Sequence, residues 1–260
     1  MSLRLKKSLG QHFLHDKKIS GKIVDLLQIE ETDTVIEIGP GAGALSQLIA
    51  QRGPKIFAAL EKDARWARER NNSSCQAILI DALRFDWKRL PAGCKLIGNL
   101  PYNVASPLIW DIVSRTPAPA LAVFMVQKEV AQRISAPPGS RAYGAISVWT
   151  QSHARISPGF TVGPGAFLPP PKVDSAVFSL NFSDVRPPEN PRALAALLHL
   201  CFQNRRKQLG GIFRRARLPE NLLEGFDPAL RPENLSVRDF NLIAQRGEKF
   251  LERIGMDKMA

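Results

Sequence analysis

The fold of this chain is decided by Thr34-Val35-Ile36-Glu37-Ile38-Gly39-Pro40-Gly41-Ala42-Gly43. The first five residues are mostly β-branched and apolar, which predicts a short buried strand. Glycines follow at once, and glycine is favoured where the backbone adopts a positive φ or approaches a ligand closely. Residues 44–50 then carry apolar side chains at helical spacing. A strand, a glycine loop and a helix in this order favour a ligand-binding unit of an α/β sheet, although the loop alone is also typical of a simple tight turn.

Polar side chains follow three further predicted strands at the point where each strand ends. Glu61, Asp81 and Asn99 directly follow the apolar runs at 55–60, 77–80 and 95–98. Open α/β sheets bind ligands at the carboxyl ends of their strands, so we expect these side chains to surround one site. The spacing Gly-x-Gly-x-Gly departs from the Gly-x-Gly-x-x-Gly of dinucleotide sites. Acidic side chains favour a cation over a pyrophosphate, and S-adenosylmethionine carries both a sulfonium and an ammonium group.

The stretch Asn99-Leu100-Pro101-Tyr102 places an amide, a backbone carbonyl and an aromatic ring within four residues of a strand end. Proline cannot continue a sheet ladder, so the Leu100 carbonyl is left for a ligand. The Asn99 amide oxygen and this carbonyl can each accept one N–H of an exocyclic amine, and the Tyr102 ring can stack on the base. Without its context, the same stretch is a turn after a strand.

Strand and helix signals alternate from residue 35 to residue 134, which predicts a mostly parallel sheet. An amphipathic helix is predicted before this alternating region. Ser106 and Pro107 suit the N-cap and the first position of a later helix, and residues 120–126 predict a further strand. Apolar stretches near 154–156 and at 175–182 predict a closing hairpin. Residues 183–191 are rich in proline and predict a linker, after which only helical spacing continues. We therefore expect domains at 1–183 and 184–260, the second one helical.

The chain is strongly basic, with 36 lysines and arginines against 24 acidic residues and a net charge of +12. Such an excess favours a polyanionic partner. Cys75, Cys94 and Cys201 are scattered, which is typical of reduced thiols in a cytoplasmic protein. The four histidines lack further ligands, so no metal site is expected. No apolar run reaches the length of a membrane span, and we expect no membrane association.

The order of several motifs resembles the KsgA (RsmA) family of ribosomal RNA adenine dimethyltransferases. The motifs are residues 10–14, 37–41, 99–103, 127–130, 167–175, 205–207 and 233–236. The resemblance covers nearly the whole chain and implies a Rossmann-like class I methyltransferase sheet of seven strands with an antiparallel final pair. It also implies S-adenosylmethionine as cofactor and dimethylation at N6 of two adjacent adenines near the 3′ end of small-subunit (16S) ribosomal RNA, within an immature 30S particle.

The resemblance assigns roles to individual residues. For the cofactor it implies His12 and Leu14 as a lid, Gly39 beside the methionine part, Glu61 at the ribose, Asp81 at the adenine and Asn99 near both methionine and target. Gly41 is expected to be a further cofactor-binding residue. Tyr102 and Phe167 are expected to stack on a flipped adenine. Arg205, Arg206 and Lys207, extended by Arg214 and Arg215, are expected to contact RNA. Cations before Gly210-Gly211 would also suit the end of a helix with a glycine cap, and His12 stands where the family more often has asparagine.

Other functions remain open from the sequence. An Erm-like methyltransferase would act on large-subunit RNA, and a non-catalytic assembly factor would bind immature ribosomal RNA without transferring a methyl group. A DNA adenine methyltransferase and a nicotinamide oxidoreductase fit the motifs less well. We expect a monomer in the cytoplasm.

Overall fold

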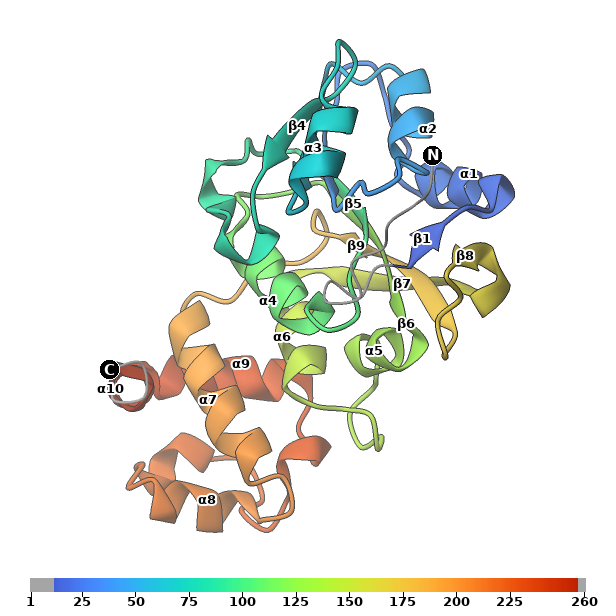
Figure 1. Cartoon of the computed structure of the whole chain (residues 1–260). Coiled ribbons are helices and arrows are strands. Elements are labelled where there is room, and N and C mark those ends of the chain that lie inside the picture. The colour runs from blue at the N-terminus through green and yellow to red at the C-terminus, as the bar shows by residue number, and fades with distance from the viewer. Residues whose placement is uncertain (1–11, 257–260) are drawn as a thin grey trace. The chain divides into compact units, whose positions relative to one another are not determined.

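The computed structural model describes residues 12–256, and its central feature is a seven-stranded sheet (Figure 1). Gly10 and Gln11 of the first motif lie outside the described residues. The strands are β2 (Thr34–Ile38), β3 (Ile56–Glu61), β4 (Gln76–Leu79), β5 (Lys95–Asn99), β6 (Leu121–Gln127), β7 (Arg155–Val162) and β9 (Ser175–Asn181). Their order is β4-β3-β2-β5-β6-β9-β7; the first five are parallel, and β9 runs antiparallel to both β6 and β7. The predicted sheet and its antiparallel final pair are confirmed.

A second sheet, absent from the sequence prediction, consists of two very short strands. β1 (Phe13–Leu14) pairs antiparallel with β8 (Phe167–Leu168), which joins positions more than 150 residues apart. β8 lies in the connection between β7 and β9, after the short helix η4 (Pro164–Ala166). The predicted closing hairpin is therefore a pair of neighbouring strands, β7 and β9, whose connection contains η4 and β8.

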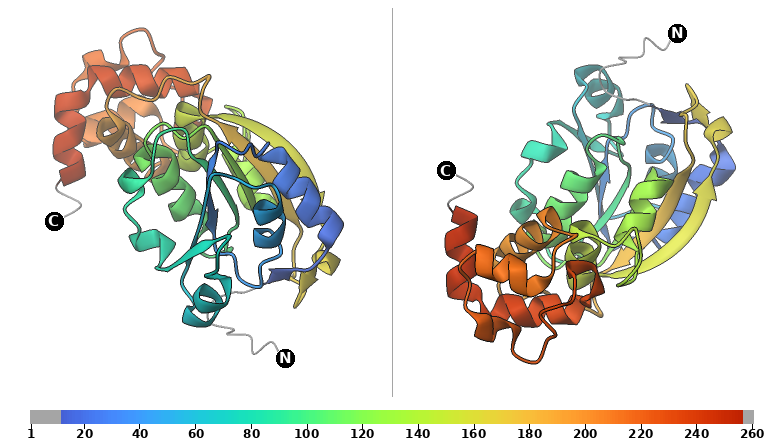
Figure 2. Two further views of the ribbon diagram at one scale, coloured as in Figure 1. Left: turned by 90° about the horizontal axis from the view of Figure 1, so that it is seen from above. Right: turned by 90° about the horizontal axis from the view of Figure 1, so that it is seen from below.

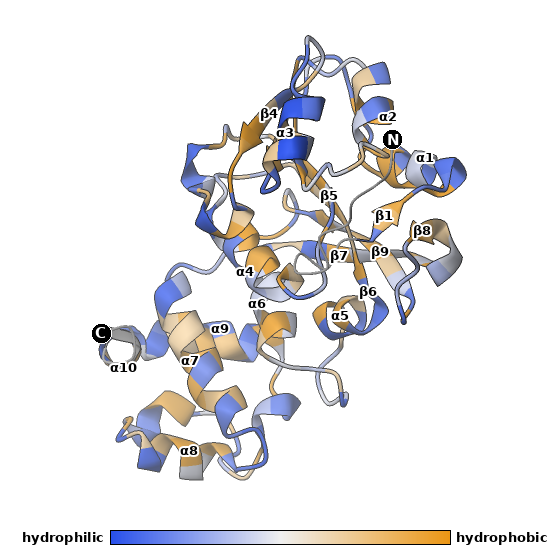
Figure 3. Ribbon diagram, in the orientation of Figure 1, coloured by the Kyte–Doolittle hydropathy of each residue, from blue (hydrophilic) through white to orange (hydrophobic). Residues whose placement is uncertain are grey.

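Helices cover both faces of the large sheet. α1 (Lys17–Leu26) and α4 (Ala105–Arg115) lie on opposite faces in every view (Figures 1 and 2). On the α1 face, alternate strand residues such as Val35, Ile97 and Val123 join the helix side chains in one core, as the two-residue period of a strand requires. Strand residues are mostly hydrophobic (Figure 3). The remaining helices here are α2 (Ser46–Gln51), α3 (Ala64–Arg70), η2 (Ala82–Arg84) and η3 (Trp87–Arg89).

The chain divides into two compact units. Residues up to 131 group with 155–184, and 132–154 group with the residues from 185 onward, so the division falls within α5 (Lys128–Ile134). The sequence predicts the boundary after residue 183 and assigns 132–154 to the first domain; the functions of domains 1–183 and 184–260 stay a prediction.

The second unit is built from helices. They are α6 (Ala145–His153), α7 (Pro191–Gln203), α8 (Leu209–Arg215), η5 (Glu220–Leu223), η6 (Pro232–Asn234), α9 (Val237–Arg246) and α10 (Glu248–Met256). α7 buries Leu194, Leu197, Leu198 and Cys201 at helical spacing, and the rings of Phe202 and Phe240 stack with centroids 5.6 Å apart. Within residues 12–256, no helix combines the length and the apolar character needed to cross a membrane.

Two local predictions are wrong. α4 begins at Ala105 with Val104 as its cap, so Ser106 is not the cap and Pro107 is the third helical residue, where no intrahelical N–H bond is needed. Gly210 and Gly211 lie inside α8 instead of capping a helix. A Cβ atom on Gly210 would lie 3.1 Å from Pro228, which explains the small residue.

Candidate active site

A cavity of about 200 Å³ opens in the first unit, around the carboxyl ends of β2, β3 and β5. It brings together most of the residues that the sequence predicts for the site: His12, Leu14, Gly39, Gly41, Glu61, Asp81, Asn99, Leu100 and Tyr102. Leu14 also belongs to the hydrophobic core. Asn99 and Leu100 thus share one cavity with Glu61, which is the juxtaposition that a two-substrate site requires.

The glycine loop is folded against Glu61. Gly39, Gly41 and Gly43 have φ angles of +69°, +49° and +87°, which only glycine adopts without strain. The Gly41 N–H donates to Glu61 Oε2 at 3.0 Å, and the Asp63 N–H donates to Glu61 Oε1 at 2.8 Å. A carboxylate has about four acceptor positions, so these bonds fix Glu61 and still leave it able to accept from a ligand.

Glu37 is a buried member of the site that the sequence prediction missed. It is 1% exposed, it lines the cavity, and the Ser46 hydroxyl donates to its Oε2 at 2.6 Å. Burial raises the pKa of Glu37 to about 7, against the hydrogen bond from Ser46, and the nearby Glu61 carboxylate adds to the rise. Its position inside the apolar run of β2 could have revealed it, because an acidic side chain is rarely buried in a strand unless it has a partner or a function.

Asp81 stays ionised at the rim of the cavity. Lys62 Nζ lies 2.7 Å from its Oδ2, and the Leu83 N–H donates to Oδ1 at 3.1 Å. The hydrogen bond from Lys62 lowers the pKa of Asp81, with a smaller contribution from Leu83. A ligand that donates hydrogen bonds would meet a carboxylate here.

The Asn99 side chain is oriented by the N-terminal segment. Its Nδ2 donates to the His12 carbonyl at 3.2 Å, which leaves Oδ1 as the acceptor of this amide. The Leu100 N–H donates to the Met125 carbonyl at 3.0 Å and ends the pairing with β6. Within residues 12–256, no hydrogen bond engages Asn99 Oδ1 or the Leu100 carbonyl. The two acceptors predicted from the sequence are therefore present together.

Tyr102 lines the cavity beside His12. Its hydroxyl lies 2.7 Å from Ser175 Oγ, and its ring stacks on the imidazole with centroids 5.6 Å apart and planes inclined by 25°. His12 Nδ1 donates to the Pro169 carbonyl at 2.8 Å. The residue predicted to stack on the base and the segment predicted to form the lid are thus in contact with each other.

Phe167 is not brought to the cavity. It is 2% exposed within the hydrophobic core, because pairing of β8 with β1 turns its side chain inward and that of Leu168 outward. Its predicted stacking role gains no support from this position.

The predicted RNA contacts fall into two groups. Arg206, Lys207, Arg214 and Arg215 are exposed in the second unit. Arg205 instead donates to Glu233 at 2.6 Å and to the backbone, and only a third of its side chain is exposed. No group of three or more His, Cys, Asp or Glu residues in the described part of the chain could hold a metal ion.

Known proteins resemble the chain along nearly its whole length. The model of the ribosomal RNA adenine dimethylase family matches residues 2–246. Ribosomal RNA small subunit methyltransferase A of Nitratidesulfovibrio vulgaris (strain DP4) is 50% identical, with 92% of this chain and 95% of the relative covered. The corresponding protein of Lawsonia intracellularis (strain PHE/MN1-00) is 45% identical, with 94% of each chain covered.

Solved structures confirm the class I methyltransferase fold. A dimethyladenosine transferase from Plasmodium falciparum superposes with a TM-score of 0.77 at 26% identity and covers 92% of this chain and 98% of its own. The 23S rRNA methyltransferase ErmE superposes with a TM-score of 0.68 at 21% identity, covers 90% of this chain and 98% of its own, and shows the fold alone. The resemblance predicted from the motifs is confirmed, and the chain belongs to the ribosomal RNA adenine dimethylase family.

Proposed function

We propose that this chain uses S-adenosylmethionine to dimethylate N6 of two adjacent adenines near the 3′ end of small-subunit (16S) ribosomal RNA. The substrate is the immature small subunit, and the enzyme acts as a monomer in the cytoplasm. The observation that carries the proposal is the shared cavity that Asn99 and Leu100 line together with the glycine loop and Glu61.

The residues of the cavity fit S-adenosylmethionine. The glycine loop offers close backbone approach, and a side chain at Gly41 would fill this cradle, since its Cβ would lie 2.8 Å from the Phe13 ring. Glu61 and Asp81 supply carboxylates for ribose hydroxyls and for donors of the adenine. When bound, the cofactor supplies an electrophilic methyl group on a sulfonium. His12 and Leu14 close the cavity from the N-terminal side.

Asn99 and Leu100 bind the target amine. The lone pair of adenine N6 is delocalised into the ring, so the amine is a poor nucleophile. Two acceptors, Asn99 Oδ1 and the Leu100 carbonyl, hold its N–H groups and favour a pyramidal nitrogen whose lone pair points out of the ring plane. When the amine forms its bond to the methyl group, the bond from that methyl to sulfur breaks and a neutral thioether leaves. The methylated amine is cationic and loses its proton readily, so positioning and electrostatics suffice without a strong general base.

Tyr102 supports the flipped base. An adenine in stacked RNA has to leave the stack before N6 is accessible, and an aromatic face stabilises it outside. The bond from the Tyr102 hydroxyl to the buried Ser175 fixes the ring plane. The exposed cations of the second unit, Arg206, Lys207, Arg214 and Arg215, supply phosphate contacts.

Transfer of a tritium-labelled methyl group to purified immature small subunits tests the proposal. The wild type should label small subunits and leave large subunits unlabelled; labelling of large subunits alone would favour the Erm-like activity. Asn99→Ala should retain cofactor binding by calorimetry and lose most of the transfer, about a hundredfold. Asn71→Ala, at an exposed asparagine at the end of α3, is the matched control. Absence of cofactor binding by the wild type would leave only a binding role in assembly.

A further inference from the structure

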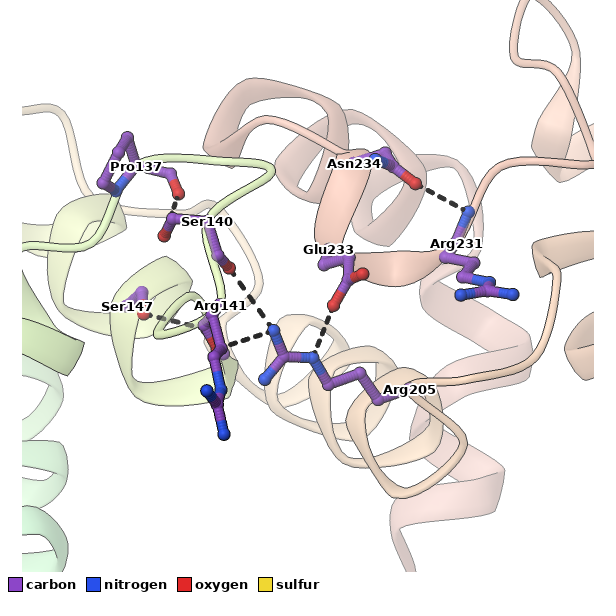
Figure 4. A network of polar contacts seen from close by, with 9 residues as sticks. Pro137, Ser140, Arg141, Ser147, Arg205, Arg231, Glu233 and Asn234 are labelled. Atoms are coloured by element: carbon purple, nitrogen blue, oxygen red, sulfur yellow. Dashed lines mark hydrogen bonds and ion pairs between the residues drawn. The ribbon is translucent and has the colours of Figure 1, made fainter.

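The second unit contains a network of polar contacts around Arg205 (Figure 4). Arg205 follows the last turn of α7, and its Nε donates to Glu233 Oε2 at 2.6 Å. Its Nη2 donates to the carbonyl oxygens of Ser140 and Arg141 at 3.3 and 2.8 Å. One guanidinium therefore joins three segments of the chain: the end of α7, helix η6 and the loop at residues 137–142.

Glu233 holds the same loop a second time through its backbone. The Gly139 N–H donates to the Glu233 carbonyl at 2.7 Å. Gly139 has a φ of +80°, a conformation that favours glycine. The Ser140 hydroxyl donates to the Pro137 carbonyl at 2.8 Å and closes the turn. Since Glu233 accepts from Arg205 through its carboxylate and from Gly139 through its carbonyl, it ties the loop to the end of α7.

The cations beside this network differ in what they contact. Arg141, Arg206 and Lys207 are exposed, and none of them forms an ion pair within the described part of the chain. Figure 4 shows the Arg141 side chain pointing away from Glu233. Arg205, by contrast, uses its Nε and one terminal nitrogen on protein acceptors. A guanidinium already engaged in this way is poorly placed to bind a phosphate with two parallel bonds.

We propose that the loop at residues 137–142 is a phosphate-contacting element of the RNA interface, with Arg141 as its ligand, and that Arg205 is a positioning residue that holds this loop while the Glu233 carboxylate orients its guanidinium. The inference rests on the proposed function, because it takes ribosomal RNA as the partner. It assigns Arg205 a different role from its neighbours Arg206 and Lys207, which stay phosphate ligands.

Removal of the Glu233 carboxylate separates the two roles. Loss of a negative charge from an RNA-binding surface would strengthen binding if charge alone mattered. If the Glu233 carboxylate orients Arg205 on the loop, Glu233→Ala should instead weaken binding, although the bond from the Gly139 N–H to the backbone carbonyl of residue 233 is kept. The effect should equal the loss of one phosphate contact, which is about fivefold at about 0.2 M salt by counterion release.

Binding is measured by filter retention of a transcript of the 3′ end of small-subunit ribosomal RNA over a series of KCl concentrations. Arg141→Ala, Arg205→Ala and Glu233→Ala should each weaken binding by about this factor and lower the salt slope by about 1. The double variant Arg141→Ala with Glu233→Ala should be no weaker than either single variant. Arg192→Ala, which removes one exposed arginine from the first turn of α7, is the matched control and should change neither value.

Trypsin cleavage reports on the loop without RNA. Cleavage after Arg141, followed by mass spectrometry, should be faster in Glu233→Ala than in the wild type, with other sites unchanged. If circular dichroism shows that Glu233→Ala is unfolded, Glu233→Gln replaces it, because glutamine keeps the shape and offers only a neutral acceptor.

Binding by Glu233→Ala that is as tight as that of the wild type, or tighter, would overturn the inference. So would a salt slope that is lowered in Arg205→Ala but unchanged in Arg141→Ala and Glu233→Ala, because Arg205 would then itself be the phosphate ligand. These outcomes differ from failure of the proposed function. A wild type that neither binds the transcript nor methylates small subunits would refute both, whereas a methylating wild type with an unaffected Glu233→Ala variant would refute this inference alone.

Discussion

Glu37 makes the stability of this protein depend on pH in a direction that can be measured. Its pKa rises from 4.5 to about 7 in the folded state, chiefly because burial disfavours the carboxylate. An acid whose pKa is raised by folding contributes stability below its unfolded pKa, and this contribution is lost as the pH rises through the folded value. The contribution of Glu37 to the free energy of unfolding should therefore fall between about pH 4.5 and pH 7 and level off above.

The magnitude follows from the two pKa values. At about 1.4 kcal/mol for each tenfold change in acidity, the step from 4.5 to about 7 corresponds to about 3 kcal/mol. Glu37→Gln removes the ionisation and keeps an oxygen that accepts from Ser46. The unfolding free energy of this variant minus that of the wild type should therefore rise by about 3 kcal/mol as the pH rises from about 4 to about 8.5.

Urea unfolding followed by circular dichroism at a series of pH values checks this expectation. Other titrating groups are shared by the two proteins and cancel in the difference between them. Glu31→Gln, at an exposed glutamate, is the matched control. A difference between Glu37→Gln and the wild type that stays constant with pH would refute the assignment of a raised pKa to Glu37.

Three further predictions concern the cavity. Gly41→Ala should weaken cofactor binding about tenfold or more by calorimetry, because it combines a φ of +49° with a contact of 2.8 Å to the Phe13 ring; unchanged affinity would mean that the loop is not fixed as described. Tyr102→Leu should keep cofactor affinity and lose methyl transfer about tenfold to a hundredfold, the value of one stacked base, and equal loss of both would contradict a stacking role. Asp81→Asn should weaken cofactor binding, whereas wild-type affinity should vary little through Asp81 between about pH 5 and pH 8, because Lys62 lowers the pKa of that carboxyl.

Local periodicity made the large sheet predictable. Buried parallel strands have continuous apolar sequences, which predict the strands of the large sheet. The polar residue at the end of each run can be identified in the same way. Glu61, Asp81 and Asn99 consequently lie on one cavity, as expected. The sheet order itself came from the family resemblance, since periodicity does not encode which strands are neighbours.

Contacts between distant short segments were not predictable. β1 and β8 contain two residues each, which is too short for any period to show, and their pairing decides that Phe167 is buried. The basic run at 205–207 likewise gave no sign that Arg205 differs from Arg206. The distinction depends on Glu233, which lies 28 positions away in sequence and beside Arg205 only in the fold.

The segment at residues 12–14 connects the glycine loop, where we propose that the cofactor binds, to Asn99 and Tyr102, where we propose that the target base binds. Phe13 limits the space beside Gly41 in the glycine loop, while the His12 carbonyl accepts from the Asn99 amide and the His12 ring stacks on Tyr102. A shift of this short strand would therefore change the space beside the glycine loop and the orientation of the Asn99 amide together. In the described structure, the only strand that pairs with β1 is β8. β8 lies in the connection that leads to Ser175, whose hydroxyl is hydrogen-bonded to that of Tyr102. One set of contacts thus holds the proposed cofactor site and the proposed base site, and displacement of β1 should affect the binding of both substrates at once.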